Sequence, residues 1–407
     1  MSLVANLDFT VFTVCNIAYL PKALVLADSL MQHNGIKLKV VVFDEKQTFL
    51  YPTQAIEIIW VEDLNVPKWR ELAFMYDIIE FSTSLKPFIA LKLMESFEKV
   101  IFLDPDTCLY SSVSPILTDL DSHDILLTPH YTTPQPDTAN ESDLGMMRFG
   151  SFNLGFFALK HSDESLAFLK WWHQRCIDFC FMESQFGLST DQKWVSIASC
   201  FFEGIKVSFN LGYNAAPWNT FERVLSKNAQ GELIINEKYP LVFFHFSNFD
   251  HEDTQYLNKR ASNEQGLEYP VLKEIADKYA NSLTKQIAMV DKVAYSYDYM
   301  TDGSYISPTL RRAYSAVRSE LPNNHEPFDS SGLVGKFAKK NYLLEKNTKK
   351  YIYPGLKEAQ KHSKLLSVIY FTLKILLKIV GSNRFYDLSK VFVYLSIFRK
   401  NRELWKI

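Results

Sequence analysis

The fold of this chain is indicated by residues 84–110, SLKPFIALKLMESFEKVIFLDPDTCLY. The first part of this segment has apolar residues at helical spacing, and the second part contains a short apolar run, VIFL, that is typical of a buried strand. Two acids, Asp104 and Asp106, follow the run directly. The segment therefore predicts a helix, a buried strand and a pair of carboxylates at the carboxyl end of that strand.

Strand and helix signals alternate along the chain around this segment. The apolar runs that predict strands are DFTVFTVC (8–15), LKVVVFD (38–44), IEIIWVED (56–63), DILLTPH (124–130) and GSFNLGFFALK (150–160). Their alternation with helical patterns predicts an α/β fold with a doubly wound, mostly parallel central sheet. Ligands of such sheets bind beyond the carboxyl ends of the strands, where the two acids are expected.

Composition and charge narrow the class of protein. Of the 407 residues, 47% are hydrophobic and 22% are charged, which excludes a wholly disordered chain. The five cysteines form no CxxC pair, so we expect reduced cytoplasmic thiols. The net charge of −2 hides an asymmetry, because residues 336–407 carry 17 Lys and Arg against 4 Asp and Glu. That basic tail predicts an anionic partner.

These patterns predict three parts. Residues 1–250 are expected to form the catalytic domain, 251–335 a helical extension packed on it, and 336–407 a basic amphipathic tail. No uninterrupted apolar run reaches about 18 residues, so we expect no transmembrane helix. The polar, Pro-rich residues 132–149 predict a loop that closes over a ligand.

The tail contains two apolar stretches, 365–380 and 391–398, flanked by basic residues. The first holds Lys374 and Lys378, which makes it too charged to span a bilayer comfortably. An interfacial helix on an anionic membrane is the favoured interpretation, and a packing or dimerisation helix is the alternative. Nucleic-acid binding is not expected, because the tail lacks interleaved base-reading residues.

The pair Asp104 and Asp106 has the residue types that bind a hard divalent cation. Two carboxylates two residues apart can converge on Mg²⁺ or Mn²⁺, which completes its coordination with diphosphate oxygens. A solvated turn with incidental acids is the simpler alternative, and the preceding apolar strand favours the metal site.

Together with further segments, residues 84–110 resemble the GT-A glycosyltransferases, most closely family 8 and related bacterial enzymes of cell-surface polysaccharide and lipopolysaccharide synthesis. The resemblance extends over roughly residues 8–335, and the order of its motifs is more specific than any one of them. The other matching segments are TVCNIAYLPKALVLADSL (13–30), GSFNLGFFALK (150–160), LSTDQKW (188–194), GYNAAPWNTFER (212–223) and PLVFFHFSNFD (240–250). The resemblance implies a GT-A, Rossmann-like fold and a glycosyltransferase that uses a nucleotide-sugar, with UDP as the expected nucleotide.

The resemblance also implies roles for individual residues. It places the nucleotide-sugar against Thr13, Cys15, Asn16, Lys86, Asp104, Asp106 and Gly155. It places Mn²⁺ or Mg²⁺ on Asp104, Asp106 and His245, and it places Asn153, Asp191 and Gln192 near the reacting sugar. The chain departs from the family at Thr13 and Asn16, where members often carry an acid and an aromatic residue.

Simpler interpretations remain open for several of these residues. His245 within FFHF can be a core histidine with satisfied hydrogen bonds, although imidazole is also a ligand for Mn²⁺. Lys86 can neutralise a phosphate or can be an ordinary surface lysine. Asp191 and Gln192 can hold sugar hydroxyls or can stand at a helix start favoured by the helix dipole.

Asn153 and Gly155 can likewise mark a plain strand end. The missing side chain of Gly155 would otherwise let a sugar approach closely.

Two functions from different classes follow. The first is a metal-dependent, retaining glycosyltransferase with a glycan or lipid-linked glycan acceptor, cytoplasmic and peripherally bound to the inner face of the cell membrane. The second is a catalytically inactive GT-A protein that binds carbohydrate or serves as a scaffold. The intact acids and His245 favour the first.

Overall fold

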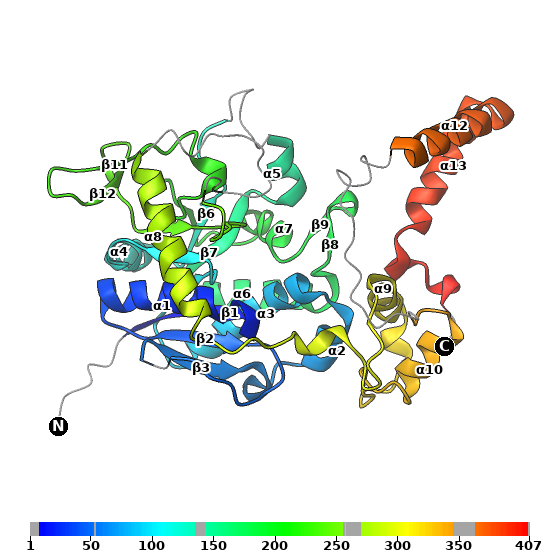
Figure 1. Cartoon of the computed structure of the whole chain (residues 1–407), viewed down its shortest axis with the longest axis horizontal. Helices are drawn as coiled ribbons and strands as arrows, with labels where there is room; N and C mark the ends of the chain where they lie inside the picture. Colours follow the sequence, from blue (N-terminus) through cyan, green and yellow to red (C-terminus); the bar gives the residue numbers. More distant parts are fainter. Residues whose placement is uncertain are drawn as a thin grey trace. The chain divides into compact units, whose positions relative to one another are not determined.

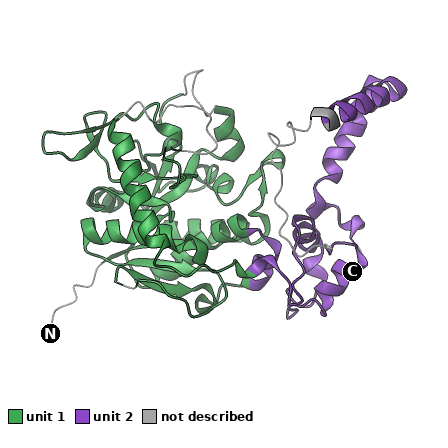
Figure 2. Cartoon of the chain, viewed as in Figure 1, with its two compact units in different colours: residues 1–69, 78–296 green, residues 70–77, 297–407 purple. Residues whose placement is uncertain are grey.

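The computed structural model of the chain describes residues 8–52, 54–134, 143–254, 257, 270–344 and 363–405. The chain divides into two compact units, one of residues 1–69 and 78–296, and the other of residues 70–77 and 297–407 (Figure 2). It therefore leaves the first unit at residue 70 and returns at residue 78. The expected three-part division at residues 250 and 335 stays a prediction.

A seven-stranded sheet forms the centre of the first unit (Figure 1), in the order β10-β6-β7-β4-β1-β2-β3. In chain order, its strands are β1 (Phe9–Cys15), β2 (Leu38–Val42), β3 (Ile56–Trp60), β4 (Lys99–Leu103), β6 (Ile125–Pro129), β7 (Phe152–Lys160) and β10 (Ile205–Val207). Neighbouring strands run parallel except at β7, which is antiparallel to β4 and β6. The prediction of an α/β fold with a mostly parallel central sheet is confirmed.

Helices cover both faces of this sheet because the strands are apolar on both sides. Val11 of β1 packs in the core that also contains buried residues of α1 (Leu20–Asn34) and α4 (Ser114–Ser122). Its neighbour Phe12 faces the opposite way and contacts the ring of Phe157. Phe157 in turn contacts a tryptophan of α6 (Asp163–Phe179), and α6 packs against α3 (Ile78–Met94).

A two-stranded sheet connects the central sheet to the end of the first unit. β5 (Thr107–Leu109) pairs antiparallel with β14 (Phe243–His245), and this register places His245 opposite Thr107. The pairing brings two segments together that lie far apart in sequence. It therefore sets His245 beside the acids that follow β4.

The remaining elements of the first unit are short, apart from one helix. They are α5 (Asp143–Phe149), β8 (Met182–Glu183), β9 (Leu188–Ser189), α7 (Gln192–Val195), β11 (Leu225–Lys227), β12 (Leu233–Ile235), β13 (Tyr239–Pro240) and the long α8 (Pro270–Ile287). Within the expected closing loop at 132–149, residues 135–142 lie outside the described part, and residues 143–149 form α5.

The second unit is helical where it is described. Its helices are the end of α2 (Trp69–Met75), then α9 (Pro308–Val317), α10 (Leu333–Lys340), α12 (Ser363–Val380) and α13 (Ser382–Leu395). The guanidinium of the buried Arg311 donates hydrogen bonds to the backbone carbonyls of Ala73, Phe74, Tyr76 and Tyr297. This side chain therefore joins the short segment 70–77 to the rest of the unit.

The helical C-terminal region expected from the sequence is present in the described part of the tail. Residues 345–362, which belong to that tail, lie outside the described residues. Within the described ranges, each helix is too short or too polar to cross a membrane.

Candidate functional site

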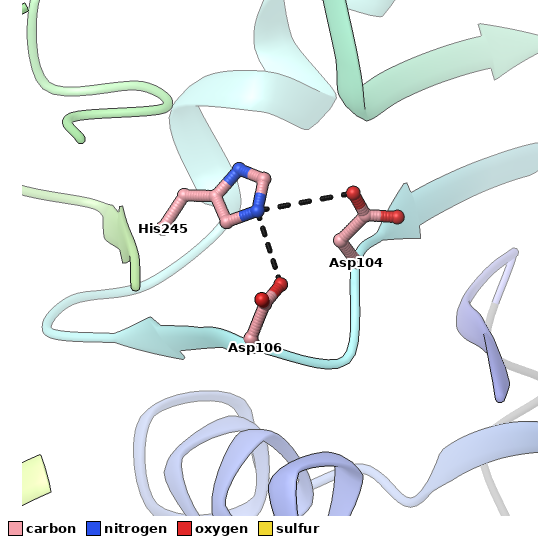
Figure 3. Close-up of side chains that lie close together, drawn as sticks. All are labelled: Asp104, Asp106 and His245. Carbon is pink, nitrogen blue, oxygen red and sulfur yellow. Dashed lines mark ion pairs between the residues drawn. The ribbon is translucent and has the colours of Figure 1, made fainter. Parts of the chain in front are cut away.

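Asp104, Asp106 and His245 converge at the carboxyl end of the central sheet (Figure 3). Asp104 follows β4, Asp106 precedes β5, and His245 ends β14. Nε2 of His245 lies 3.0 Å from Oδ1 of Asp106 and 3.8 Å from Oδ2 of Asp104. One ligand atom from each of the three side chains lies within 4.8 Å of the others.

The charges of this cluster are strongly coupled. Burial raises the pKa of Asp106, but the charge and hydrogen bond of His245 outweigh it and lower that pKa to about 2. Burial lowers the pKa of His245, and the two carboxylates outweigh it, so that the pKa is raised. The two carboxylates thus favour a positive charge at the position between them.

The donor set of the cluster fits a divalent cation. Two carboxylates and one imidazole, converging through Nε2, suit Mn²⁺ and are also compatible with Mg²⁺. Nδ1 of His245 is buried and has no hydrogen-bond partner among the described residues. The ring is instead held by packing, because the indole of Trp218 lies edge-on to it with ring centroids 5.2 Å apart.

Gly155 has a structural reason to be glycine. A Cβ built at this position would lie 2.4 Å from Cε1 and 2.7 Å from Nδ1 of His245. From the sequence, the missing side chain is expected to make room for a sugar. In the structure, the room is taken by the His245 imidazole.

Lys86 lies behind the cluster, on α3. Its ammonium lies 3.3 Å from Oδ1 of Asp104 and 3.6 Å from Oδ2 of Asp191, and it donates a 2.9 Å hydrogen bond to the carbonyl of Leu154. Burial lowers the pKa of Lys86, but the two carboxylates outweigh it and raise that pKa. Lys86 is therefore a fixed, charged anchor for the two acids. It was expected to contact a phosphate, yet its ammonium is occupied by protein groups.

Asp191 is a buried partner of this lysine. Its side chain is 2% exposed, and Oδ1 accepts a 3.0 Å hydrogen bond from the hydroxyl of Thr190. Oδ2 has no hydrogen-bond partner among the described residues. Burial raises the pKa of Asp191, and the charge of Lys86 opposes this rise. The buried carboxylate of Asp191 thus contacts the ammonium of Lys86, which in turn contacts Asp104.

Gln192 and Asn153 present amides that the backbone holds in place. Gln192 begins α7, accepts from the amide of Leu154 at 3.3 Å and donates to the carbonyl of Phe149 at 3.0 Å. Oδ1 of Asn153 accepts from the amide of Gly155 at 3.1 Å and from Nδ2 of Asn214 at 3.0 Å.

Two cavities are lined in part by residues of the site. The first, of about 310 Å³, is lined by Val14, Cys15, Asn16, Tyr19, Phe43, Ile78, Ile79, Ser82, Thr83, Lys86, Asp104 and Pro105. The second, of about 350 Å³, is lined by His130, Tyr131, Gly145, Met146, Phe149, Asn153, Met182, Ser189, Thr190, Gln192, Trp218, Ser247 and Asn248.

Some of the predicted site residues line these cavities, Lys86 and Asp104 the first, and Asn153 and Gln192 the second. Cys15 and Asn16 line the first cavity, whereas Thr13 is fully buried and does not line it. Burial strongly raises the pKa of the Cys15 thiol, so this thiol stays neutral.

Four further residues lie at the site without a role predicted from the sequence: Tyr19, Lys22, Asn214 and Trp218. Asn214 and Trp218 lie in the segment GYNAAPWNTFER, and Asn214 has a φ of 52°, a conformation that asparagine tolerates better than most residues. Tyr19 and Lys22 lie in the first matching segment, at the start of α1. The two segments therefore indicated the region of the site, but not which of their side chains face it.

Comparisons with known proteins were made by sequence and by structure. No protein-family model matches the chain. YfnF, an uncharacterised protein of Bacillus subtilis (strain 168), is 26% identical over 176 residues, or 42% of this chain and 58% of YfnF. YfnD, an uncharacterised protein of the same organism, is 25% identical over 246 residues, or 58% of this chain and 76% of YfnD. The matched part thus spans somewhat more than half of YfnF.

Similar solved structures include three glycosyltransferases. The galactosyltransferase LgtC, in complex with donor and acceptor sugar analogues, has 16% identity and a TM-score of 0.40, covering 68% of this chain and 96% of LgtC. The bifunctional WbbM, in its apo form, has 13% identity and a TM-score of 0.38, and the match covers 70% of this chain and 53% of WbbM. Mouse xyloside xylosyltransferase 1 has 14% identity and a TM-score of 0.34, and the match covers 51% of this chain and 87% of the mouse protein.

Proposed function

We propose that this protein is a metal-dependent glycosyltransferase that moves a sugar from a UDP-sugar to a glycan or lipid-linked glycan, with retention of anomeric configuration. The observation that carries the proposal is the cluster of Asp104, Asp106 and His245 at the edge of the first cavity, which Asp104 itself lines. A cavity beside a divalent-cation site at the carboxyl ends of parallel strands suits a nucleotide diphosphate.

Each part of the site has a task in this reaction. A divalent cation held by the cluster would neutralise the negative charge of the leaving diphosphate. Lys86 holds Asp104 and Asp191 in place through its contacts with both carboxylates. The amides of Asn153 and Gln192 face the second cavity, where they can hold sugar hydroxyls.

The second cavity also supports retention. None of the described residues that line it is a carboxylate. His130 lines it, and burial lowers the pKa of this histidine to about 4. A direct displacement with inversion usually needs a carboxylate base beside the acceptor, and the described lining of this cavity supplies none.

The decisive experiment is a donor screen with the full-length protein. UDP-, GDP- and ADP-linked sugars are added with Mn²⁺, and release of the nucleoside diphosphate is measured with and without simple glycan acceptors. We expect release from UDP-sugars that depends on Mn²⁺, and proton NMR of the product should show a retained anomeric configuration. Binding of sugars without any turnover would favour the inactive carbohydrate-binding alternative.

We also propose that the tail binds an anionic membrane surface at the inner face of the cell membrane. The helices α12 and α13 expose many apolar side chains, among them Ile369, Phe371, Ile375, Val391 and Phe392. The basic residues of the tail add attraction to anionic lipid, at about 1 kcal/mol for each residue near the surface. Such a location suits a lipid-linked acceptor.

The membrane proposal is tested by sedimentation with vesicles of phosphatidylglycerol or phosphatidylcholine. We expect binding to the anionic vesicles that high salt weakens without abolishing, because salt screens only the electrostatic part. Replacing Phe371 and Ile375 by aspartate should reduce binding at every salt concentration. A paired change of Lys374 and Lys378 to glutamine should reduce binding mainly at low salt. Equal sedimentation with both lipids would remove the preference for an anionic surface, and no sedimentation with either lipid would remove the membrane role.

A further inference from the structure

Lys22 lies between the first cavity and the metal cluster. It belongs to the first turn of α1, and its Nζ lies 3.8 Å from Oδ2 of Asp106. The same ammonium lies 4.3 Å from the centroid of the Tyr19 ring, and Tyr19 lines the first cavity. The side chain thus reaches from the wall of the cavity to the edge of the cluster.

The ammonium of Lys22 is available to a ligand. A distance of 3.8 Å to Asp106 is too long for a hydrogen bond, and no hydrogen bond from this ammonium to another described residue is found. The side chain is 17% exposed. Lys86 differs, because its side chain is 6% exposed and its ammonium is held by Asp104, Asp191 and a backbone carbonyl.

We propose that Lys22, and not Lys86, is the lysine that binds the leaving diphosphate. The inference rests on the proposed function, in which a nucleoside occupies the first cavity and its diphosphate reaches the cluster. A diphosphate on this path passes between Tyr19 and Asp106, where the ammonium lies. The amino-terminal end of α1 adds partial positive charge at the same place.

The position of Lys22 also predicts opposite effects on two ligands. Its positive charge near Asp106 repels a divalent cation, so removing that charge should leave Mn²⁺ binding unchanged or strengthen it. The same charge attracts phosphate oxygens, so its removal should weaken diphosphate binding. General damage to the site would instead weaken both.

The test measures binding to the full-length protein by calorimetry. The probes are Mn²⁺ alone, and then UDP, UMP and pyrophosphate, each with Mn²⁺. The variants are Lys22→Gln and Lys22→Arg, with Lys39→Gln as a matched control. Lys39 is also a half-buried lysine, at 15% side-chain exposure, and it too pairs with an acid, Glu57, and lies over a ring, that of Phe97.

We expect Lys22→Gln to lower the affinity for UDP about tenfold, the size of one charge-assisted hydrogen bond. Pyrophosphate should show a similar loss, UMP a smaller one, and Mn²⁺ alone none. Lys22→Arg should retain most of the affinity for UDP, and Lys39→Gln should bind every probe as the wild type does.

Two results would overturn the assignment while leaving the proposed function intact. The first is unchanged binding of UDP and pyrophosphate by Lys22→Gln. The second is an equal loss of binding for Mn²⁺ alone and for UDP, which would make Lys22 a structural residue. If the wild type binds neither UDP nor pyrophosphate with Mn²⁺, the UDP-sugar function itself is wrong and Lys22 loses its role with it.

Discussion

A buried arginine of the second unit and two buried polar atoms at the site of the first unit differ in how far hydrogen bonds satisfy them. In the second unit, the guanidinium of Arg311 is satisfied by four backbone carbonyls and lies 3.5 Å from a carboxylate oxygen of Asp298. In the first unit, Nδ1 of His245 and Oδ2 of Asp191 are buried without a hydrogen-bond partner among the described residues. Buried polar groups with partners stabilise a fold, whereas groups left without partners mark a place reserved for function.

The largest effect should come from removing a ligand of the cluster. Asp106→Asn should lower the transfer rate on the order of a thousandfold, because the cation that stabilises the leaving diphosphate loses a charged ligand. Mn²⁺ should raise the melting temperature of the wild type and not that of the variant. Wild-type turnover by Asp106→Asn would show that the metal site lies elsewhere.

Arg311 should matter for stability and not for chemistry. Arg311→Met leaves four buried carbonyls without their donor and should lower the free energy of unfolding by about 3 kcal/mol. Urea denaturation followed by circular dichroism measures this loss, with the exposed Arg384→Met as the control in the same unit. Transfer activity well below the unfolding transition should remain. Loss of activity in the folded variant would break the contrast between the two units.

Gly155→Ala tests whether metal binding requires the imidazole of His245 to occupy the space beside residue 155. The added Cβ would displace the imidazole, so we expect Mn²⁺ affinity and activity to fall about tenfold to a hundredfold with the fold retained. Gly204→Ala is the control, because its closest contact is the flexible side chain of Glu164. Manganese titration distinguishes the two variants. Equal affinity in both would mean that the ring has other space.

The smallest effect concerns pH and His130. Burial lowers the pKa of His130 in the folded protein to about 4, against about 6.5 in the unfolded chain. The unfolded chain therefore binds a proton first, so stability falls as pH drops from about 6.5 to about 4. His130→Gln should flatten that part of the stability curve measured by urea denaturation. His123→Gln, at the other end of β6, serves as the control. An unchanged slope in the His130 variant would contradict the assigned shift.

The sequence predicted the parts of the site that depend on local pattern. The run VIFL followed by Asp104 and Asp106 specifies a strand with acids at its carboxyl end, and the structure has this arrangement. The place of His245 followed from the resemblance alone, because the β5–β14 pairing that sets it beside Asp106 joins segments far apart in the chain.

Other features depend on tertiary contacts that no local pattern encodes. The approach of Lys22 to Asp106 requires α1 and the β4–β5 turn to be placed together. The contacts of Lys86 with Asp104 and Asp191 likewise join segments far apart in the chain. Nothing in the composition of residues 70–77 indicated which core they would join.

The route of residues 70–77 has a consequence for how the protein is made. These residues, including the buried Phe74 and Tyr76, leave the ribosome before the 219 residues of 78–296 and have their partners only after them. At bacterial and eukaryotic rates of synthesis, this delay lasts roughly 10 to 40 s. During that time we expect Phe74 and Tyr76 to be exposed on the nascent chain. The segment would then offer a chaperone a binding site that the finished protein buries.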